Sequence, residues 1–329
     1  MSGGPPIGLA LGSHMPPENI QRTAQLAEQL GYGELWFSED YFFAGGFAGV
    51  TAALAATTSM PVGFGILPAM TRHPALLAME LATVSRLYPG RVWPGIGLGV
   101  PAWLDQMGLR PGSPLTAVRE CITNLRRLLD GEEVTFQGRY FDFDRVVLTH
   151  KPEERLPIYT GFVNEKALRL SGEIADGTVL SVLAGTDYIR WARAILDEAA
   201  ADAGHTARHR VITYVLFSVD PDSKKAKEAV RDVTAFYLEA MPDTALSQVY
   251  GIQPQLHEVL ARGGGAAVAR EMPAEWLEDL AIAGDPDECA AKIRSFLDAG
   301  SDSVVLWLFP LERGPEIAEY GARELLPRL

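Results

Sequence analysis

The chain has 329 residues, of which 47% are hydrophobic and 22% are charged, values typical of a folded globular protein. Its formal net charge of −13 argues against a non-specific nucleic-acid binder, because such proteins need a basic surface. No charged-then-apolar leader opens the sequence, and no apolar run reaches the roughly eighteen residues of a membrane span, so we expect a cytoplasmic protein.

Short apolar runs alternate with helical patterns along the chain. The predicted strands span residues 7–11, 34–38, 61–67, 91–98, 156–160, 177–181, 211–219 and 303–309. The predicted helices span residues 17–30, 46–58, 75–88, 115–129, 165–175, 187–203, 223–239, 286–299 and 315–326. Eight strands alternating with helices predict an α/β protein, a single (β/α)8 TIM barrel covering residues 1–329.

Two segments depart from this alternation. Residues 133–148 alternate in polarity around Gln137-Gly138, which predicts a β-hairpin inserted after the fourth helix, at about 132–150. Residues 241–282 lack a strand pattern and contain three consecutive glycines, Gly263 to Gly265. We interpret this segment, about 241–283, as a loop with short helices inserted after the seventh helix, and as a candidate lid.

Residues 60–99 are the segment most indicative of function. Two nearly continuous apolar runs flank a helix, as expected of parallel strands that are buried on both faces. The second run ends in the alternating glycines Gly95, Gly97 and Gly99. Ligands of such proteins bind at the carboxyl ends of the strands. No third glycine follows two residues after Gly99, so the spacing does not fit a Rossmann dinucleotide site.

Helix 46–58 contains no charged residue, and helix 75–88 carries only Glu80 and Arg86. On the outside of one barrel these helices would leave apolar surface in water, so we predict a homodimer through both of them. The distant Cys121 and Cys289 are predicted to be buried free thiols. No HExxH, CxxC or HxH spacing indicates a metal site, and no GxSxG elbow indicates a hydrolase.

The segment around the Arg72-His73-Pro74 turn and the Pro89-Gly90-Arg91 strand start resembles the bacterial-luciferase-like oxidoreductases. Residues 30–40 (LGYGELWFSED), 128–148, 167–180 and 281–306 look like further segments of that superfamily, in the same order. The superfamily contains flavin-dependent monooxygenases and reductases that use the deazaflavin coenzyme F420. Residues 114–135 (PLTAVRECITNLRRLLDGEEVT) look most like the F420 branch around methylenetetrahydromethanopterin reductase.

The resemblance implies where a cofactor would bind. The Gly65–Ile66 bond matches a backbone bulge that packs against the ring in family members, in several cases through a non-prolyl cis bond; a close-packed barrel glycine is the alternative. The loop at 161–166 matches the loop that binds the cofactor's phosphate arm in the family. The candidate cofactor contacts in this loop are Gly161, Val163, Asn164 and Lys166, and Gly97 and Gly99 would contact the cofactor from the other side. Arg72 either holds the ligand or belongs to a helix-start turn that His73 caps.

The catalytic position departs from the family pattern. F420 enzymes of this family often have Asp-His after the second strand, where this chain has Glu39 and Asp40. Asp40 would act as an acid only if burial raised its pKa, and His14 is the alternative proton donor. Tyr41, Phe42 and Trp103 would wall a substrate pocket, unless they serve only in packing.

Three functions remain from these observations. The favoured one is hydride transfer between reduced F420 and a small organic substrate. The first alternative is a monooxygenase that uses reduced FMN and oxygen, which needs a pocket sealed from water. The second is a flavin-binding protein without turnover, because the expected histidine is absent. The sequence does not name the substrate.

Overall fold

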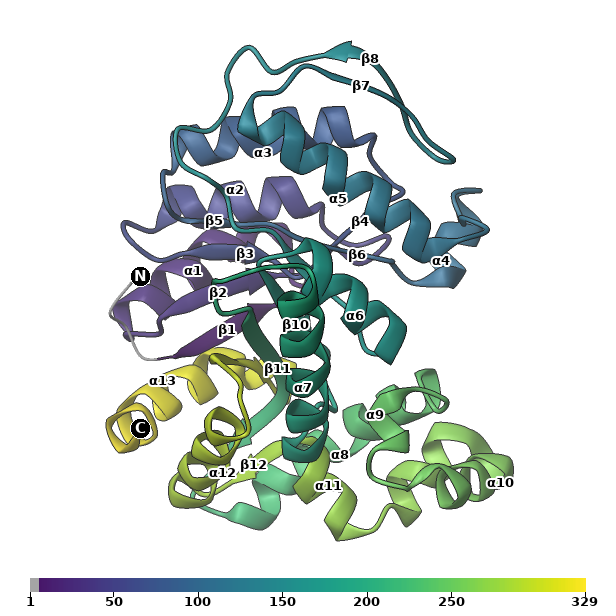
Figure 1. Cartoon of the computed structure of the whole chain (residues 1–329). Coiled ribbons are helices and arrows are strands. Elements are labelled where there is room, and N and C mark those ends of the chain that lie inside the picture. The colour runs from purple at the N-terminus through teal and green to yellow at the C-terminus, as the bar shows by residue number, and fades with distance from the viewer. Residues whose placement is uncertain (1–5) are drawn as a thin grey trace.

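The computed structural model describes residues 6–329, which form an α/β fold around a curled parallel sheet (Figure 1). The sheet has eleven strands, and every pairing within it is parallel. Its strands are β1 (Ile7–Leu11), β2 (Glu34–Phe37), β3 (Val62–Phe64), β4 (Leu67–Pro68), β5 (Val92–Trp93), β6 (Gly95–Gly97), β9 (Tyr159–Gly161), β10 (Gly177–Leu180), β11 (Arg210–Val219), β12 (Ile282–Gly284) and β13 (Ser303–Leu308). Their order is β4-β6-β9-β10-β11-β13-β1-β2-β3-β5, with β12 beside β11.

The apolar runs form strands because helices bury their outer face and the packed interior buries the other. All four residues of β2 are buried, as are nine of the ten in β11. Four details of the strand prediction are wrong. The third strand is split into β3 and β4, the fourth is split by Pro94 into β5 and β6, and β12 begins at Ile282, where no strand was expected. The fifth strand, β9, also begins three residues later than predicted.

The helices cover the outside of the sheet (Figure 1). They are α1 (Ile20–Gln29), α2 (Gly46–Ala56), α3 (Pro74–Leu87), α4 (Pro101–Gln106), α5 (Pro114–Asp130), α6 (Glu165–Ile174), α7 (Thr186–Asp202), α8 (Ser223–Ala240), α12 (Pro286–Asp298) and α13 (Gly314–Glu324). Among residues 6–329, no helix combines the length and apolar character needed to cross a membrane.

The hairpin is present as β7 (Val134–Gln137) and β8 (Asp142–Val146), which are antiparallel and lie over α3 and α5 (Figure 1). The Glu120 carboxylate on α5 accepts hydrogen bonds from the backbone amides of Arg139 at 2.8 Å and Tyr140 at 2.9 Å. His73 caps α3, as one interpretation of the sequence expected, because its ring accepts a bond from the amide of Ala75 at 3.2 Å.

The second insertion is more helical than predicted. It consists of α9 (Ala245–Gln248), α10 (Gln253–Glu271) and α11 (Ala274–Leu280). Gly263 and Gly264 have non-helical backbone angles and divide α10 into two shorter helices, which agrees with the short helices predicted around the glycine triplet. The Asn164 side chain accepts a bond from the amide of Ala245 at 3.0 Å, which fixes the insertion to the loop after β9.

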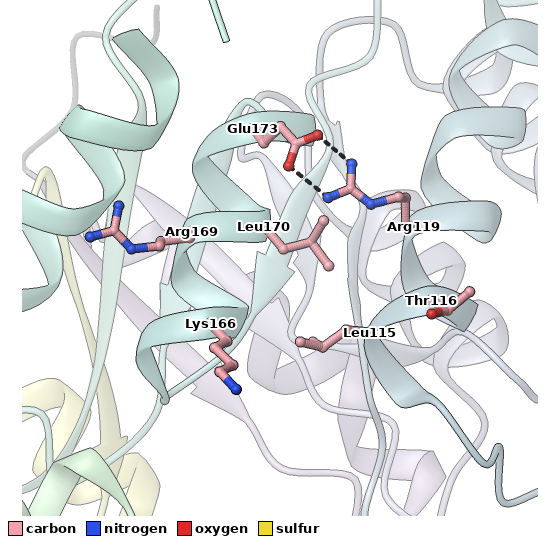
Figure 2. Close-up of a pocket in the computed structure, with 7 residues that line it drawn as sticks. All are labelled: Leu115, Thr116, Arg119, Lys166, Arg169, Leu170 and Glu173. Carbon is pink, nitrogen blue, oxygen red and sulfur yellow. Dashed lines mark hydrogen bonds and ion pairs between the residues drawn. The ribbon is translucent and has the colours of Figure 1, made fainter. Parts of the chain in front are cut away.

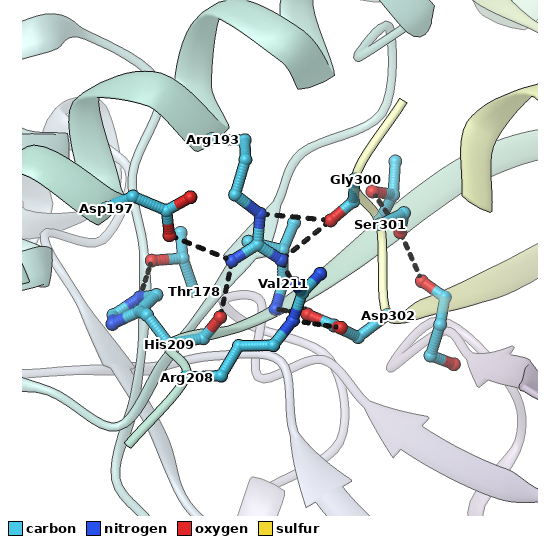
Figure 3. A network of polar contacts seen from close by, with 11 residues as sticks. Thr178, Arg193, Asp197, Arg208, His209, Val211, Gly300, Ser301 and Asp302 are labelled. Carbon is cyan, nitrogen blue, oxygen red and sulfur yellow. Dashed lines mark hydrogen bonds and ion pairs between the residues drawn. The ribbon is translucent and has the colours of Figure 1, made fainter. Parts of the chain in front are cut away.

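A polar network joins the amino ends of β10, β11 and β13 (Figure 3). The Arg193 guanidinium donates to the carbonyl oxygens of His209 and Gly300, at 2.6 and 2.7 Å, and to the Asp302 carboxylate at 2.6 Å. The buried His209 ring lies 2.8 Å from the Thr178 hydroxyl. In barrels this end of the strands usually contributes stability, so the candidate active site is sought at the opposite end.

The thiols of Cys121 and Cys289 are free and buried, as predicted. Burial raises the pKa of each thiol to about 12, so both stay protonated and unreactive at neutral pH.

Candidate active site

The carboxyl ends of the strands open onto partly exposed residues, which we call the mouth. It includes Ser38, Asp40, Gly65, Ile66, Leu98, Gly161, Val163, Ser181 and Trp307. Gly65 and Ile66 are informative because the residues of β3 and β4 on either side of them are buried. The third strand therefore reaches solvent only at this pair, and the Gly65–Ile66 peptide bond is cis.

The mouth brings together both predicted proton donors. The Ser13 hydroxyl donates to Asp40 Oδ2 at 3.2 Å, and the Asp40 amide donates back to Ser13 Oγ at 3.3 Å. The His14 ring stacks on Trp307, with the ring centroids 6.1 Å apart. Partial burial lowers the pKa of His14, while the negative charge of Asp40 acts in the opposite direction, so the imidazole is neutral at pH 7.

The loops after β2 and β4 are held together by a buried ion pair. Arg72 Nη1 and Nη2 lie 2.6 and 2.8 Å from the two carboxylate oxygens of Glu39. The amide of Gly46 donates to the same carboxylate at 2.7 Å, and the Tyr41 hydroxyl does so at 2.9 Å. Only 3% of the Glu39 side chain is exposed, whereas 25% of the Arg72 side chain is, so the carboxylate is the buried member of the pair. This clamp explains Arg72 without a ligand and fixes the backbone on which Asp40 lies.

Aromatic side chains line one edge of the mouth. The Tyr41 ring lies 6.2 Å from Trp103 and 5.8 Å from Phe42, measured between centroids, and the Tyr41–Phe42 bond is cis. Phe42 is 66% exposed. The pocket-wall role predicted for these residues stays a prediction, because no ligand contact tests it.

The predicted cofactor glycines have a packing role. A Cβ on Gly97 would lie 2.0 Å from Ile66 Cδ1, and a Cβ on Gly161 would lie 2.8 Å from Ile66 Cγ2. Ile66 thus occupies the space that side chains at 97 and 161 would need. Gly99 has a positive φ of 74°, a conformation that favours glycine. Cofactor contact by these residues stays a prediction.

The loop after β9 leads into α6, whose N-terminus has no side-chain cap. Asn164 is the N-cap residue, but its side chain is bonded to Ala245 instead, and the Val163 carbonyl accepts the Tyr188 hydroxyl at 2.6 Å. Lys166 extends from the first turn of α6 away from the Arg119–Glu173 ion pair (Figure 2). It lines a pocket of about 250 Å³ between α5 and α6, which also contains Leu115, Thr116, Arg169 and Leu170.

Three aromatic residues of the site were missed by sequence reasoning. The Tyr237 ring on α8 lies 6.1 Å from Trp307 on β13, and the Tyr214 hydroxyl on β11 reaches the main chain at Gly65. Tyr214 and Trp307 lie inside continuous apolar runs, where the sequence does not reveal which face each side chain occupies. Within residues 6–329, no group of three or more His, Cys, Asp or Glu side chains is gathered as metal ligands are.

The profile of the family described as luciferase-like monooxygenase matches residues 3–303. The chain is 31% identical, over 88% of its length and 90% of the relative's, to 5,10-methylenetetrahydromethanopterin reductase from Methanolobus tindarius. It is 29% identical to F420-dependent glucose-6-phosphate dehydrogenase from Microbacterium testaceum, covering 95% of this chain and 94% of that one. The structure of the coenzyme F420-dependent tetrahydromethanopterin reductase from Methanopyrus kandleri superposes with a TM-score of 0.86, at 27% identity and 98% coverage of both chains.

Proposed function

Since the chain belongs to the luciferase-like monooxygenase family, we propose that it transfers a hydride between reduced coenzyme F420 and a small organic substrate at the mouth. The observation that carries this proposal is the partly exposed Gly65–Ile66 bulge together with the hydrogen-bonded Asp40–Ser13 pair. Two of the three similar proteins described above, a dehydrogenase and a reductase, are F420-dependent, which supports F420 over FMN. The closed eight-stranded barrel with two insertions, as one domain, is part of the same proposal.

The residues present fit a flat ring that carries a phosphate arm. The partly exposed bulge at Gly65–Ile66 offers an apolar surface, and the side chains of Tyr214 and Trp36 pack against Gly65. The uncapped amides at the start of α6 favour an anion, because the helix dipole is positive there. Lys166 adds a positive charge at the same turn. We assign the ring to the bulge and the phosphate to the start of α6.

When bound, reduced F420 supplies a hydride and, unlike reduced FMN, reacts poorly with oxygen. The chain itself supplies the accompanying proton. The Asp40 carboxyl is held by Ser13 and by a backbone fixed through the Glu39–Arg72 clamp, so its position is defined before the substrate binds. A neutral His14 can accept a proton but not donate one, so it serves in the direction that oxidises the substrate, and proton donation in the reducing direction is assigned to Asp40.

The FMN-dependent monooxygenase remains the alternative, supported by the description of the family that the chain matches. A flavin-binding protein without turnover is the second alternative. We also propose a homodimer through α2 and α3. Leu76, Met79 and Leu87 on α3 are 55, 52 and 63% exposed, and they form the apolar surface that a partner would cover.

A turnover assay separates these functions. Reduced F420 is mixed without oxygen with a panel of imines, enones and ketones, and the return of the oxidised F420 absorption is followed. Turnover with at least one compound supports hydride transfer. Oxygen uptake with reduced FMN, without F420 turnover, supports the monooxygenase. Binding of either cofactor without turnover leaves the non-catalytic alternative.

A further inference from the structure

The hydroxyl of Tyr214 is buried and has no hydrogen-bond partner among residues 6–329. Its neighbours on β11, Thr213 and Val215, are 0 and 2% exposed, whereas Tyr214 is 7% exposed. Tyr214 therefore belongs to the packed interior, and its oxygen is inaccessible to solvent. A phenol that loses water on folding without gaining a partner weakens the fold, so its presence is not explained by stability.

The position of this oxygen connects it to the mouth. A Cβ placed on Gly65 would lie 2.0 Å from the Tyr214 oxygen and 2.9 Å from its Cζ atom. The phenol thus takes the place of a side chain at residue 65, directly beneath the Gly65–Ile66 bulge. The Tyr214 ring also packs edge-on against Trp36, with the centroids 6.4 Å apart. This contact directs the hydroxyl toward the bulge.

The chemistry of the group is that of a donor. Burial raises the pKa of Tyr214 well above its usual value of 10, and the negative charges of Glu34 and Asp40 act in the same direction. The phenol therefore keeps its proton at any working pH. The phenol therefore does not serve as a base. Its O–H group can donate a hydrogen bond, but no acceptor lies within reach among the described residues.

We propose that Tyr214 is a positioning residue whose phenol donates a hydrogen bond to a carbonyl oxygen of the cofactor ring packed on Gly65–Ile66. The proposal rests on the proposed function. It holds for F420 and for FMN, because both rings carry a pyrimidine-dione edge with carbonyl acceptors. The bond would set the register of the ring on the bulge and so the distance from its reactive carbon to Asp40.

The test compares Tyr214→Phe with Tyr32→Phe. Tyr32 is the matched control because its buried hydroxyl already donates to the Ala318 carbonyl at 2.9 Å, far from the mouth. For each protein we would measure the thermal midpoint without cofactor, the affinity for F420, and the shift of the F420 absorption band on binding. The first quantity reports on folding alone, and the last reports on a bond to the ring.

We expect Tyr214→Phe to keep or raise the thermal midpoint, to bind F420 about three- to tenfold more weakly, and to reduce the band shift. Tyr32→Phe should lower the midpoint and leave F420 binding unchanged. A lower midpoint for Tyr214→Phe, with wild-type F420 affinity, would overturn the proposal, because the hydroxyl would then be paired within the protein. Unchanged F420 affinity with a raised KM for substrate would overturn it in favour of a substrate contact. If the wild-type protein binds neither F420 nor FMN, the proposed function itself fails.

Discussion

His209 should make the free energy of unfolding depend on pH. The residue is 4% exposed, and burial, together with the positive charge of Arg193, lowers the pKa of His209 to about 4 from 6.5 (Figure 3). Between these values the unfolded chain binds more protons than the folded protein, so stability is complete above pH 6.5 and falls as the pH drops toward 4. The loss is about 2 kcal/mol between about pH 7.5 and pH 5, and about 3 kcal/mol in full.

The assay is urea denaturation at fixed protein concentration across this pH range, for wild type, His209→Gln and His205→Gln. The glutamine at 209 keeps a side-chain partner for the Thr178 hydroxyl but does not titrate. His205 is an exposed control whose ring lies 2.8 Å from the Glu173 carbonyl. With an unfolding entropy of about 2.1 cal/mol/K per residue, 2 kcal/mol corresponds to a thermal midpoint lower by about 3 °C. His209→Gln should lose this part of the pH dependence, and His205→Gln should retain it. Parallel curves for wild type and His209→Gln would refute the reasoning.

Three further predictions concern the site and the assembly. Lys166→Ala should weaken F420 binding about fivefold, because an exposed ionic contact contributes about that much to affinity. In the same titration, the affinity for a ring analogue without phosphate should not change. Equal weakening of both would remove Lys166 from the phosphate site. Asp40→Asn should lower kcat by about a hundredfold or more with little change in F420 affinity, because it removes a proton carrier; an unchanged kcat would clear Asp40 of that role. Met79→Glu should convert a dimer to monomers in sedimentation experiments, and an unchanged mass would place the interface elsewhere.

The sequence predicts the alternation of strands and helices well because short apolar runs alternate with stretches of helical periodicity along the whole chain. It does not predict where a strand is interrupted. The splits at Gly65–Ile66 and at Pro94 depend on how neighbouring strands pair and on the side chain of Ile66 filling the space over Gly97 and Gly161. The break at Gly263 and Gly264 could be predicted, because glycine has the weakest helix preference after proline and both residues have non-helical backbone angles.

The sequence predicted the site residues that follow adjacent strands, but it did not predict the contacts between residues that are far apart in the chain. Asp40 and His14 follow adjacent strands, so their proximity follows from a parallel sheet. The pairing of Arg72 with Glu39 could not be predicted in this way, because Glu39 lies 33 residues earlier and only the folded loops bring the two side chains together. Tyr214 was missed because it lies within a run, VITYVLFSV, that is apolar on both faces. The register of β11 in the sheet determines that the Tyr214 hydroxyl points toward Gly65.

The most direct test of the central claim is a paired titration of the purified protein with F420 and FMN, followed by tryptophan fluorescence. Trp36 is fully buried beside Tyr214, and Trp103 lies next to Tyr41, so both should report a ring bound at the mouth. The account predicts tight binding of F420 with a change in tryptophan emission, and much weaker binding of FMN. Tight FMN binding with weak F420 binding would contradict it and assign the protein to the oxygen-using enzymes of its family.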